Sequence, residues 1–142
     1  EFADGTFDII HEYGALHHLD LPAAFTELSR ILKPTGKLIC TEALRHNPLI
    51  HWYRKRTPHL RTDWEVAHIL GFPEIKSGQK YFASLNLRTF HLAALAAVPF
   101  RKAFFFEPLL GLFNIMDRVL LSIPLVRQMA WVAVIEYSRP IK

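Results

Sequence analysis

Apolar residues recur along the chain at two spacings, and these spacings predict its first elements. A short apolar run at 7–12 follows a turn signal and predicts a strand. From 21 to 32 apolar residues recur every three or four positions, which is typical of a helix with one buried face. A second apolar run at 37–42 predicts another strand. This order is a βαβ unit, so we expect two parallel strands with a right-handed crossover.

Polar residues and prolines mark the ends of the predicted helix. Asp20 is suited to cap its first turn, and Pro22 lacks the N–H group that would have no partner there. Lys33 precedes Pro34, a position that disfavours helical geometry, so we expect the helix to end there.

The middle of the chain predicts short elements. Asn-Pro and Thr-Pro pairs bound a helix over 48–57, and a capping-box pattern starts another at Thr62 that ends at Gly71. Short strand segments are predicted at 74–77 and 80–85, and helical spacing returns over 87–98.

The last third is the most apolar part. Residues 103–126 are interrupted by charges and prolines, so they do not make a membrane span, which needs about 20 mostly apolar residues. We expect a buried or lid-forming helical region there, in preference to a peripheral membrane contact. Residues 129–137 are nearly uncharged and predict a terminal strand covered on both faces.

Composition limits the kind of protein. A chain of 142 residues with a formal charge of +4 and one cysteine suits a single α/β domain in a reducing cytoplasm. A basic stretch at 45–61, with arginines and histidines, predicts a solvated helix face more readily than an anion or membrane site. Its aromatics show no repeated stacking pattern, so no nucleic-acid partner is predicted.

Residues 2–44, FADGTFDIIHEYGALHHLDLPAAFTELSRILKPTGKLICTEAL, resemble the second half of a class I S-adenosylmethionine-dependent methyltransferase domain. Thr35 stands where that family usually has the first of two glycines. The matching positions lie in the strand start, the loop after it and the motif before the second strand: Phe7, Asp8, Leu16, His18, Leu19, Arg30, Leu32, Lys33, Pro34 and Gly36.

The resemblance implies a partial Rossmann-like methyltransferase sheet, with parallel strands, an antiparallel terminal strand and apolar helices inserted at about 45–71 and 87–126. The family's glycine-rich cofactor loop has no counterpart among the six glycines. We therefore expect residues 1–142 to be the C-terminal portion of one methyltransferase domain, incomplete and inactive alone. The helices at 87–98 and 103–123 are expected to form a cap over the substrate.

Ligands of open α/β sheets bind outside the carboxyl ends of the strands, which here follow residues 12 and 42. The resemblance places Glu12, Tyr13, Gly14 and His18 at the cofactor, S-adenosylmethionine. His17 has the chemistry of a general base, although a solvent-facing loop position is the plainer interpretation.

No metal site is predicted, because adjacent histidines in regular structure point in different directions and no ligand spacing accompanies His17 and His18. Glu42, at the end of the second strand, either faces the substrate or pairs with Arg45.

The predicted function is transfer of a methyl group from S-adenosylmethionine to an O, N or C nucleophile of a small molecule. Two alternatives remain at this point. One is a different Rossmann-like nucleotide-cofactor enzyme, and the other is a non-catalytic fragment that binds a partner or a membrane. The sequence specifies neither the acceptor nor the oligomeric state.

Overall fold

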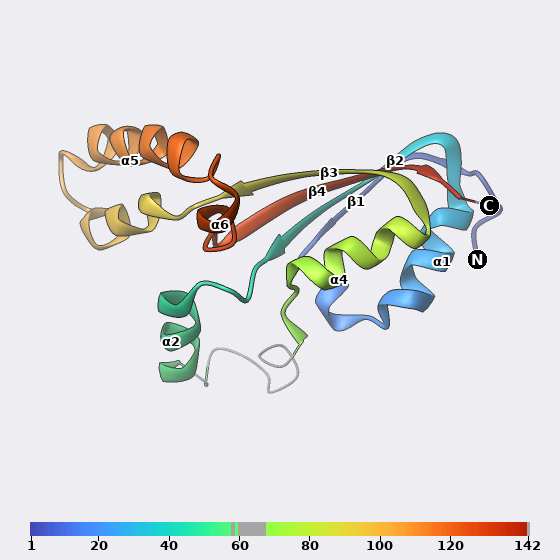
Figure 1. Ribbon diagram of the computed structural model, residues 1–142, viewed down its shortest axis with the longest axis horizontal. Helices are drawn as coiled ribbons and strands as arrows, with labels where there is room; N and C mark the ends of the chain where they lie inside the picture. The colour runs from blue at the N-terminus through green and yellow to red at the C-terminus, as the bar shows by residue number, and fades with distance from the viewer. Residues whose placement is uncertain (58, 60–67, 142) are drawn as a thin grey trace.

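One four-stranded sheet organises the molecule (Figure 1). The computed structural model describes residues 1–57, 59 and 68–141. The strands are β1 (Phe7–Tyr13), β2 (Leu32–Ala43), β3 (Phe82–Phe90) and β4 (Val132–Pro140), and they lie in the order β1-β2-β4-β3. β1 is parallel to β2, whereas β4 is antiparallel to both β2 and β3. The predicted parallel pair and the predicted antiparallel terminal strand are both confirmed.

The βαβ unit forms as its pattern predicts. The side chain of Asp20 accepts a hydrogen bond from the Ala23 N–H at 2.8 Å and caps α1 (Leu21–Ile31), with Pro22 in the first turn. β2 begins directly at Leu32, which pairs with Phe7 before the regular register starts at Ile9 and Lys37. The strand predicted at 37–42 is therefore present and longer than its apolar run.

The segment between residues 71 and 90 differs from its prediction. Residues 74–77 are helical, within α4 (Phe72–Ser77), and a 3₁₀ turn at Gly78–Lys80 leads into β3. Four residues are too few for their spacing to distinguish a strand from a helix, and here the N–H of Gly71 donates to the Glu74 carboxylate at the start of a helix. The predicted helix at 87–98 is also wrong in its first part, because β3 continues to Phe90 and a 3₁₀ helix follows only at Ala93–Phe100.

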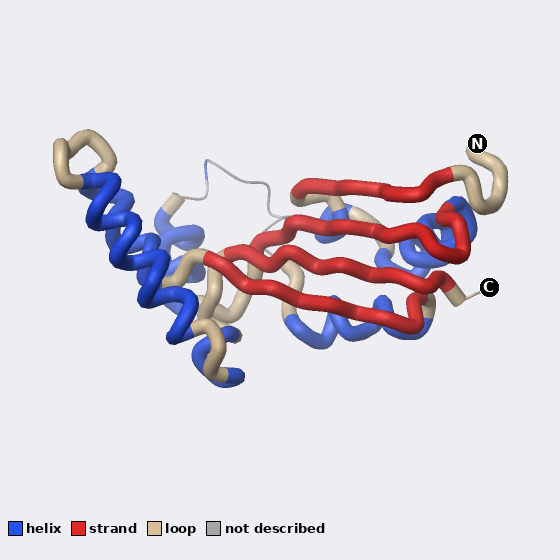
Figure 2. The backbone as a smooth tube through the Cα atoms, turned by 90° about the horizontal axis from the view of Figure 1, so that it is seen from above, coloured by secondary structure: helices blue, strands red, loops and turns tan. Residues whose placement is uncertain are grey.

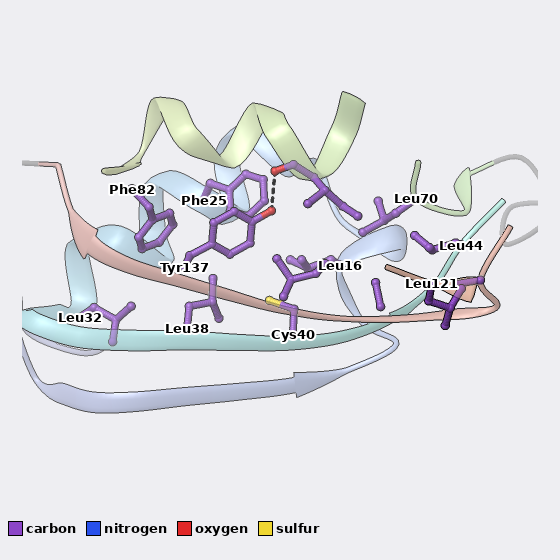
Figure 3. Close-up of a cluster of buried hydrophobic side chains, with 14 residues drawn as sticks. Leu16, Phe25, Leu32, Leu38, Cys40, Leu44, Leu70, Phe82, Leu121 and Tyr137 are labelled. Atoms are coloured by element: carbon purple, nitrogen blue, oxygen red, sulfur yellow. Dashed lines mark hydrogen bonds between the residues drawn. The ribbon is translucent and has the colours of Figure 1, made fainter. Parts of the chain in front are cut away.

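The core lies between the sheet and the helices α1 and α4, which cover the same face (Figure 1). Rings from three elements meet there: Phe25 and Phe82 each lie near Tyr137, with ring centroids 5.3 Å apart in both pairs (Figure 3). The Tyr137 hydroxyl donates a hydrogen bond to the Ile75 carbonyl at 2.6 Å, which joins β4 to α4.

The opposite face of the sheet is open among the described residues. In β4 Ala133, Ile135 and Tyr137 are fully buried, but the alternate positions Val132 and Val134 are only half-buried. The expectation that this strand is covered on both faces is therefore wrong for the described chain. Its nearly uncharged sequence reflects one buried face, with Val132, Val134 and Glu136 half-buried on the other.

The remaining helices lie toward one end of the sheet (Figures 1 and 2). α2 (Pro48–Arg56) is capped by Asn47, as predicted, whereas the helix predicted from Thr62 lies outside the described residues and Gly71 lies just before α4. After the 3₁₀ helix come α5 (Phe106–Leu120) and α6 (Pro124–Arg127). No described helix is long and apolar enough to cross a membrane.

Two expectations about these helices need correction. Residues 103–126 are expected to be buried or lid-forming, and the buried alternative is wrong for α5, because its large apolar side chains at Leu112, Ile115 and Val119 are exposed. In the basic stretch, Arg54 is buried and donates to the Leu44 carbonyl at 3.1 Å, so α2 is not a fully solvated basic face. Arg56 instead lies over the ring of Trp52, 3.9 Å from its centroid.

Candidate functional site

A histidine and a buried glutamate meet where β1 and β2 end. The Nδ1 atom of His17 lies 2.7 Å from Oε2 of Glu42, and the Glu42 side chain is completely buried. His17 comes from the 3₁₀ turn Leu16–His18 after β1, and Glu42 is the second-last residue of β2. Parallel pairing brings both to the carboxyl edge, because Tyr13 lies opposite Thr41 in the register.

The second oxygen of Glu42 fixes the loop that carries the histidine. Oε1 accepts a hydrogen bond from the Leu16 N–H at 2.7 Å, and Leu16 itself is buried in the core. A carboxylate only accepts hydrogen bonds, so in the neutral imidazole of His17 the hydrogen is on Nδ1 and the lone pair is on Nε2. Among the described residues, none forms a hydrogen bond with Nε2 of His17. The site therefore presents a proton acceptor in a defined direction.

Gly14 shapes the floor beside this imidazole. Its φ angle is +63°, in the left-handed region that favours glycine, and its N–H donates to the Thr41 carbonyl at 2.9 Å. A Cβ atom built at Gly14 would come within 3.8 Å of Cε1 of His17. The turn thus lets the chain leave β1 and bring His17 back over the edge of the sheet.

A pocket of about 510 Å³ opens in front of these groups, on the open side of the sheet. Its lining comes from the carboxyl ends of β1 and β2, the start of β4 and the end of β3: Tyr13, Gly14, His17, Thr41, Glu42, Ala43, Phe90, His91, Trp131, Val132 and Val134. Such a position, with an apolar wall and a few polar groups, is the usual place for a ligand in an α/β fold.

Glu12 points away from this pocket. One of its carboxylate oxygens accepts from the Ala15 N–H at 2.8 Å, and the other is buried with no hydrogen-bond partner. Burial raises the pKa of Glu12, and the negative charge of Glu42 raises it further. The Cys40 thiol has a raised pKa for the same reason, burial, with added repulsion from Glu12.

The predicted site residues therefore separate into two groups. Tyr13, Gly14 and His17 line the pocket, whereas Glu12 lies beneath the loop and His18 is exposed beside it. The rings of His17 and His18 stack, with centroids 4.2 Å apart, so the expectation that they point in different directions is wrong. This contact occurs in the 3₁₀ turn Leu16–His18, which is neither an α-helix nor a strand.

The pairing of Glu42 could not be chosen from the sequence. Arg45, its proposed partner, instead lies 3.1 Å from the Glu74 carboxylate, so that ion-pair alternative is wrong. The sequence signal for Glu42 is its position two residues after Cys40 in β2, which places it at the carboxyl edge of the sheet, near the end of β1. His91 and Trp131 belong to the pocket as well, and no motif in the sequence indicates them.

His91 has an unusual backbone. Its φ angle is +64°, although it is not glycine, and the Trp131 N–H donates to its carbonyl at 3.0 Å and to that of Phe90 at 3.2 Å. Such conformations cost about 1–3 kcal/mol and persist where the surroundings hold them.

In the described part of the chain, no group of three His, Cys, Asp or Glu side chains is arranged to hold a metal ion.

Sequence comparison connects the first part of the chain to methyltransferases. Residues 1–40 match the model of the family described as "Methyltransferase domain". The uncharacterised protein YafE of Escherichia coli K12 is 50% identical over 44 residues, which make up 30% of this chain and 21% of that protein. The matched segment thus spans about a fifth of that relative.

Structural comparison covers nearly the whole chain. Geranyl diphosphate C-methyltransferase from Streptomyces coelicolor A3(2), solved with Mg²⁺, geranyl diphosphate and S-adenosylhomocysteine, has a TM-score of 0.54 at 15% identity. Phosphoethanolamine N-methyltransferase 2 from Haemonchus contortus, solved with phosphomonomethylethanolamine and S-adenosylhomocysteine, has a TM-score of 0.53 at 14% identity. Both comparisons cover 97% of this chain, but only 49% and 35% of those chains. The predicted Rossmann-like methyltransferase fold and the family resemblance are confirmed.

Proposed function

We propose that the chain carries the methyl-acceptor side of an S-adenosylmethionine-dependent methyltransferase that acts on a small molecule. The carrying observation is the pocket at the carboxyl edge, where Glu42 holds His17 with Nε2 unoccupied by any described residue. The match of residues 1–40 to the methyltransferase family supports the cofactor, as do the fold's relatives solved with S-adenosylhomocysteine.

The residues present fit the cofactor at this edge. Gly14 turns the chain without a side chain, and Tyr13, which is 79% exposed, stands beside it at the mouth of the pocket. We place the methionine part of the cofactor along Tyr13 and Gly14. Glu12 and His18, which the resemblance also assigns to the cofactor, act on this site through the loop: Glu12 bonds to Ala15, and His18 stacks on His17. When bound, the cofactor supplies an activated methyl group on a sulfonium.

The chain's own residues orient the acceptor and receive its proton. Nε2 of His17 would take the proton that an acceptor hydroxyl or amine loses on gaining the methyl group that the cofactor would supply. Glu42 then stabilises the imidazolium, because its carboxylate already bonds to Nδ1 at 2.7 Å. Holding both reactants in line and excluding water supplies the remaining rate enhancement.

The open face of the sheet supports the view that this chain is part of a larger methyltransferase domain. Ile9 and Tyr13 on β1 are 61% and 79% exposed, although both belong to a sheet whose other face is well packed. The solved relatives are two to three times longer than the region they share with this chain. We propose that further elements of the domain cover this face and complete the cofactor site.

Titration of the full-length protein with S-adenosylhomocysteine tests the proposal. We expect saturable binding by calorimetry, and Gly14→Val should weaken it at least about tenfold, because a β-branched residue opposes the positive φ and crowds His17. Gly111→Ala is the matched control, since a Cβ there meets nothing within 4 Å. A full-length protein that folds but does not bind S-adenosylhomocysteine would overturn the proposed function.

The proton acceptor needs a separate test. With methyl-labelled S-adenosylmethionine and a panel of phenols, amines and carboxylic acids, His17→Gln and Glu42→Gln should each slow transfer to hydroxyl or amine acceptors by about 100-fold or more. Binding of S-adenosylhomocysteine should stay within about twofold. Full activity in both variants would remove His17 from the mechanism, and loss of cofactor binding would assign it a structural role.

A further inference from the structure

A second pocket, also of about 510 Å³, lies between the end of β3 and the helices α5 and α6. Three arginines from three different elements line it: Arg88 on β3, Arg118 on α5 and Arg127 on α6. Residues so far apart in the sequence converge only because α5 runs back to the edge strand before α6 and β4 begin (Figure 2).

The three guanidinium groups are not neutralised by the described residues. None of the ion pairs found among those residues includes Arg88, Arg118 or Arg127. Arg127 stands over the Phe72 ring, 5.8 Å from its centroid, and its Nε is buried with no hydrogen-bond partner. A buried donor without a partner costs free energy that an anionic acceptor in the pocket would recover.

The one carboxylate in the lining is already occupied. Asp117 is buried, and its two oxygens accept from the backbone N–H groups of Leu92, Ala93 and Ala94 at 2.6–3.2 Å. Asp117 therefore fixes the backbone and does not pair with an arginine. Three arginines and one aspartate leave the lining with a formal charge of +2. This charge matches a dianion better than a single carboxylate.

The pocket lies next to the candidate active site. Phe90 and His91 line both pockets and form the wall between them. A group held by the arginines would therefore lie beside the space in front of His17. His91, which has the left-handed backbone conformation, lies between the two pockets.

We propose that the arginine pocket binds a phosphate or diphosphate group of the methyl acceptor, and so selects phosphorylated small molecules. Identifying the bound molecule as the methyl acceptor rests on the proposed function. The existence of the anion site does not. Planar guanidinium groups form paired hydrogen bonds with phosphate oxygens, and three of them from separate elements define a position as well as a charge.

Calorimetry of the full-length protein with inorganic pyrophosphate tests the site directly. We expect saturable binding that weakens about tenfold in Arg88→Gln and in Arg118→Gln, and that falls as salt is added. Arg101→Gln is the matched control, because Arg101 is exposed in the same helical region but outside the pocket. No saturable binding, or equal loss in Arg101→Gln and the pocket variants, would overturn the site.

Arg127 needs a milder change, because its side chain also packs over Phe72. Arg127→Lys keeps the charge but loses the paired hydrogen bonds, so it should weaken pyrophosphate binding with little change in the unfolding midpoint. Unchanged pyrophosphate affinity in this variant would remove Arg127 from the site.

The two proposals fail separately. Binding of S-adenosylhomocysteine should be the same in wild type and Arg88→Gln, because the arginines bind the acceptor. If pyrophosphate binds through the arginines but S-adenosylhomocysteine does not bind, the anion site stands and the methyltransferase proposal falls. If S-adenosylhomocysteine binds and pyrophosphate does not, the inference of a phosphorylated acceptor falls alone.

Discussion

Two regions of the molecule are held together in different ways. In the sheet region, made of the four strands with α1 and α4, apolar side chains such as Leu38 and Ile135 are fully buried. In the outlying region, residues 91–127, the large apolar side chains of α5 are mostly exposed, and a buried carboxylate, Asp117, joins α5 to the 3₁₀ helix. Apolar composition therefore does not measure burial, because the more apolar region has the smaller core.

Each region also contains a carboxylate bonded to backbone N–H groups, and the difference between them separates structure from chemistry. Asp117 accepts three backbone hydrogen bonds and has no described side-chain partner. Glu42 accepts one, from Leu16, and its other oxygen holds the imidazole of His17. We therefore expect substitutions at Asp117 to change stability first, and substitutions at Glu42 to change activity first.

The largest expected effect is at Asp117. Asp117→Ala leaves three backbone N–H groups of residues 92–94 without their acceptor, so the free energy of unfolding should fall by about 3 kcal/mol in a urea titration. The free energy of unfolding of Asp117→Asn should lie between those of wild type and Asp117→Ala, because one acceptor oxygen remains. Glu107→Ala, on the exposed side of the same helix, should cost less than about 1 kcal/mol. Equal losses at the two positions would mean that Asp117 does not hold this region together.

The next effect tests packing in the sheet region. A Cβ at Gly78 would come within 2.5 Å of Tyr137 Cε1, and the ring cannot move freely because its hydroxyl bonds to the Ile75 carbonyl. Gly78→Ala should therefore lower the free energy of unfolding by about 1–3 kcal/mol in the same urea titration. No loss would show that α4 shifts away from β4 at little cost.

Glu12 gives a smaller effect that depends on pH. Its pKa is raised above the ordinary 4.5, first by burial and then by Glu42, so the native state holds this proton more tightly than the unfolded state. Stability from this group is therefore greatest at low pH and falls as pH rises from about 4.5 through the native pKa.

Glu12→Gln removes that dependence. The variant should unfold at a higher urea concentration than wild type at pH 7, and the difference should vanish below about pH 4.5. Glu107→Gln, at an exposed position, should follow wild type throughout. A Glu12→Gln variant that is less stable than wild type at pH 7 would show that the carboxylate's bond to Ala15 outweighs the cost of its burial.

The contrast between the regions also explains which predictions succeed. The βαβ unit is readable from the sequence because its signals are local: the Asp20 cap, the helical spacing and the Lys33-Pro34 stop lie within the elements they define. The pairing of Glu42 with His17 spans 25 residues and depends on the parallel register of β1 and β2. The periodicity of the sequence predicts where the strands lie, but it does not predict the register in which β1 and β2 pair.

The outlying region is harder to predict for a related reason. The three N–H groups at 92–94 meet Asp117 some 23–25 residues later, and no local pattern in 103–126 marks that aspartate as buried. In α4 a segment of strand length forms a helix, because Glu74 caps its first turn and Ile75 reaches the core. In both segments tertiary contacts determine the structure, and the local sequence pattern does not predict it.

The smallest effect has the opposite sign and completes the comparison of the two glycines. Gly111 lies in the middle of α5, and a Cβ there meets no atom within 4 Å. Gly111→Ala should raise the free energy of unfolding by about 0.4–1 kcal/mol, because alanine loses less backbone freedom on folding and nothing crowds it. The same substitution at Gly78 should destabilise, so the pair measures packing density at matched chemistry. A loss of stability at Gly111 would mean that another surface packs against this face of α5 in the full-length protein.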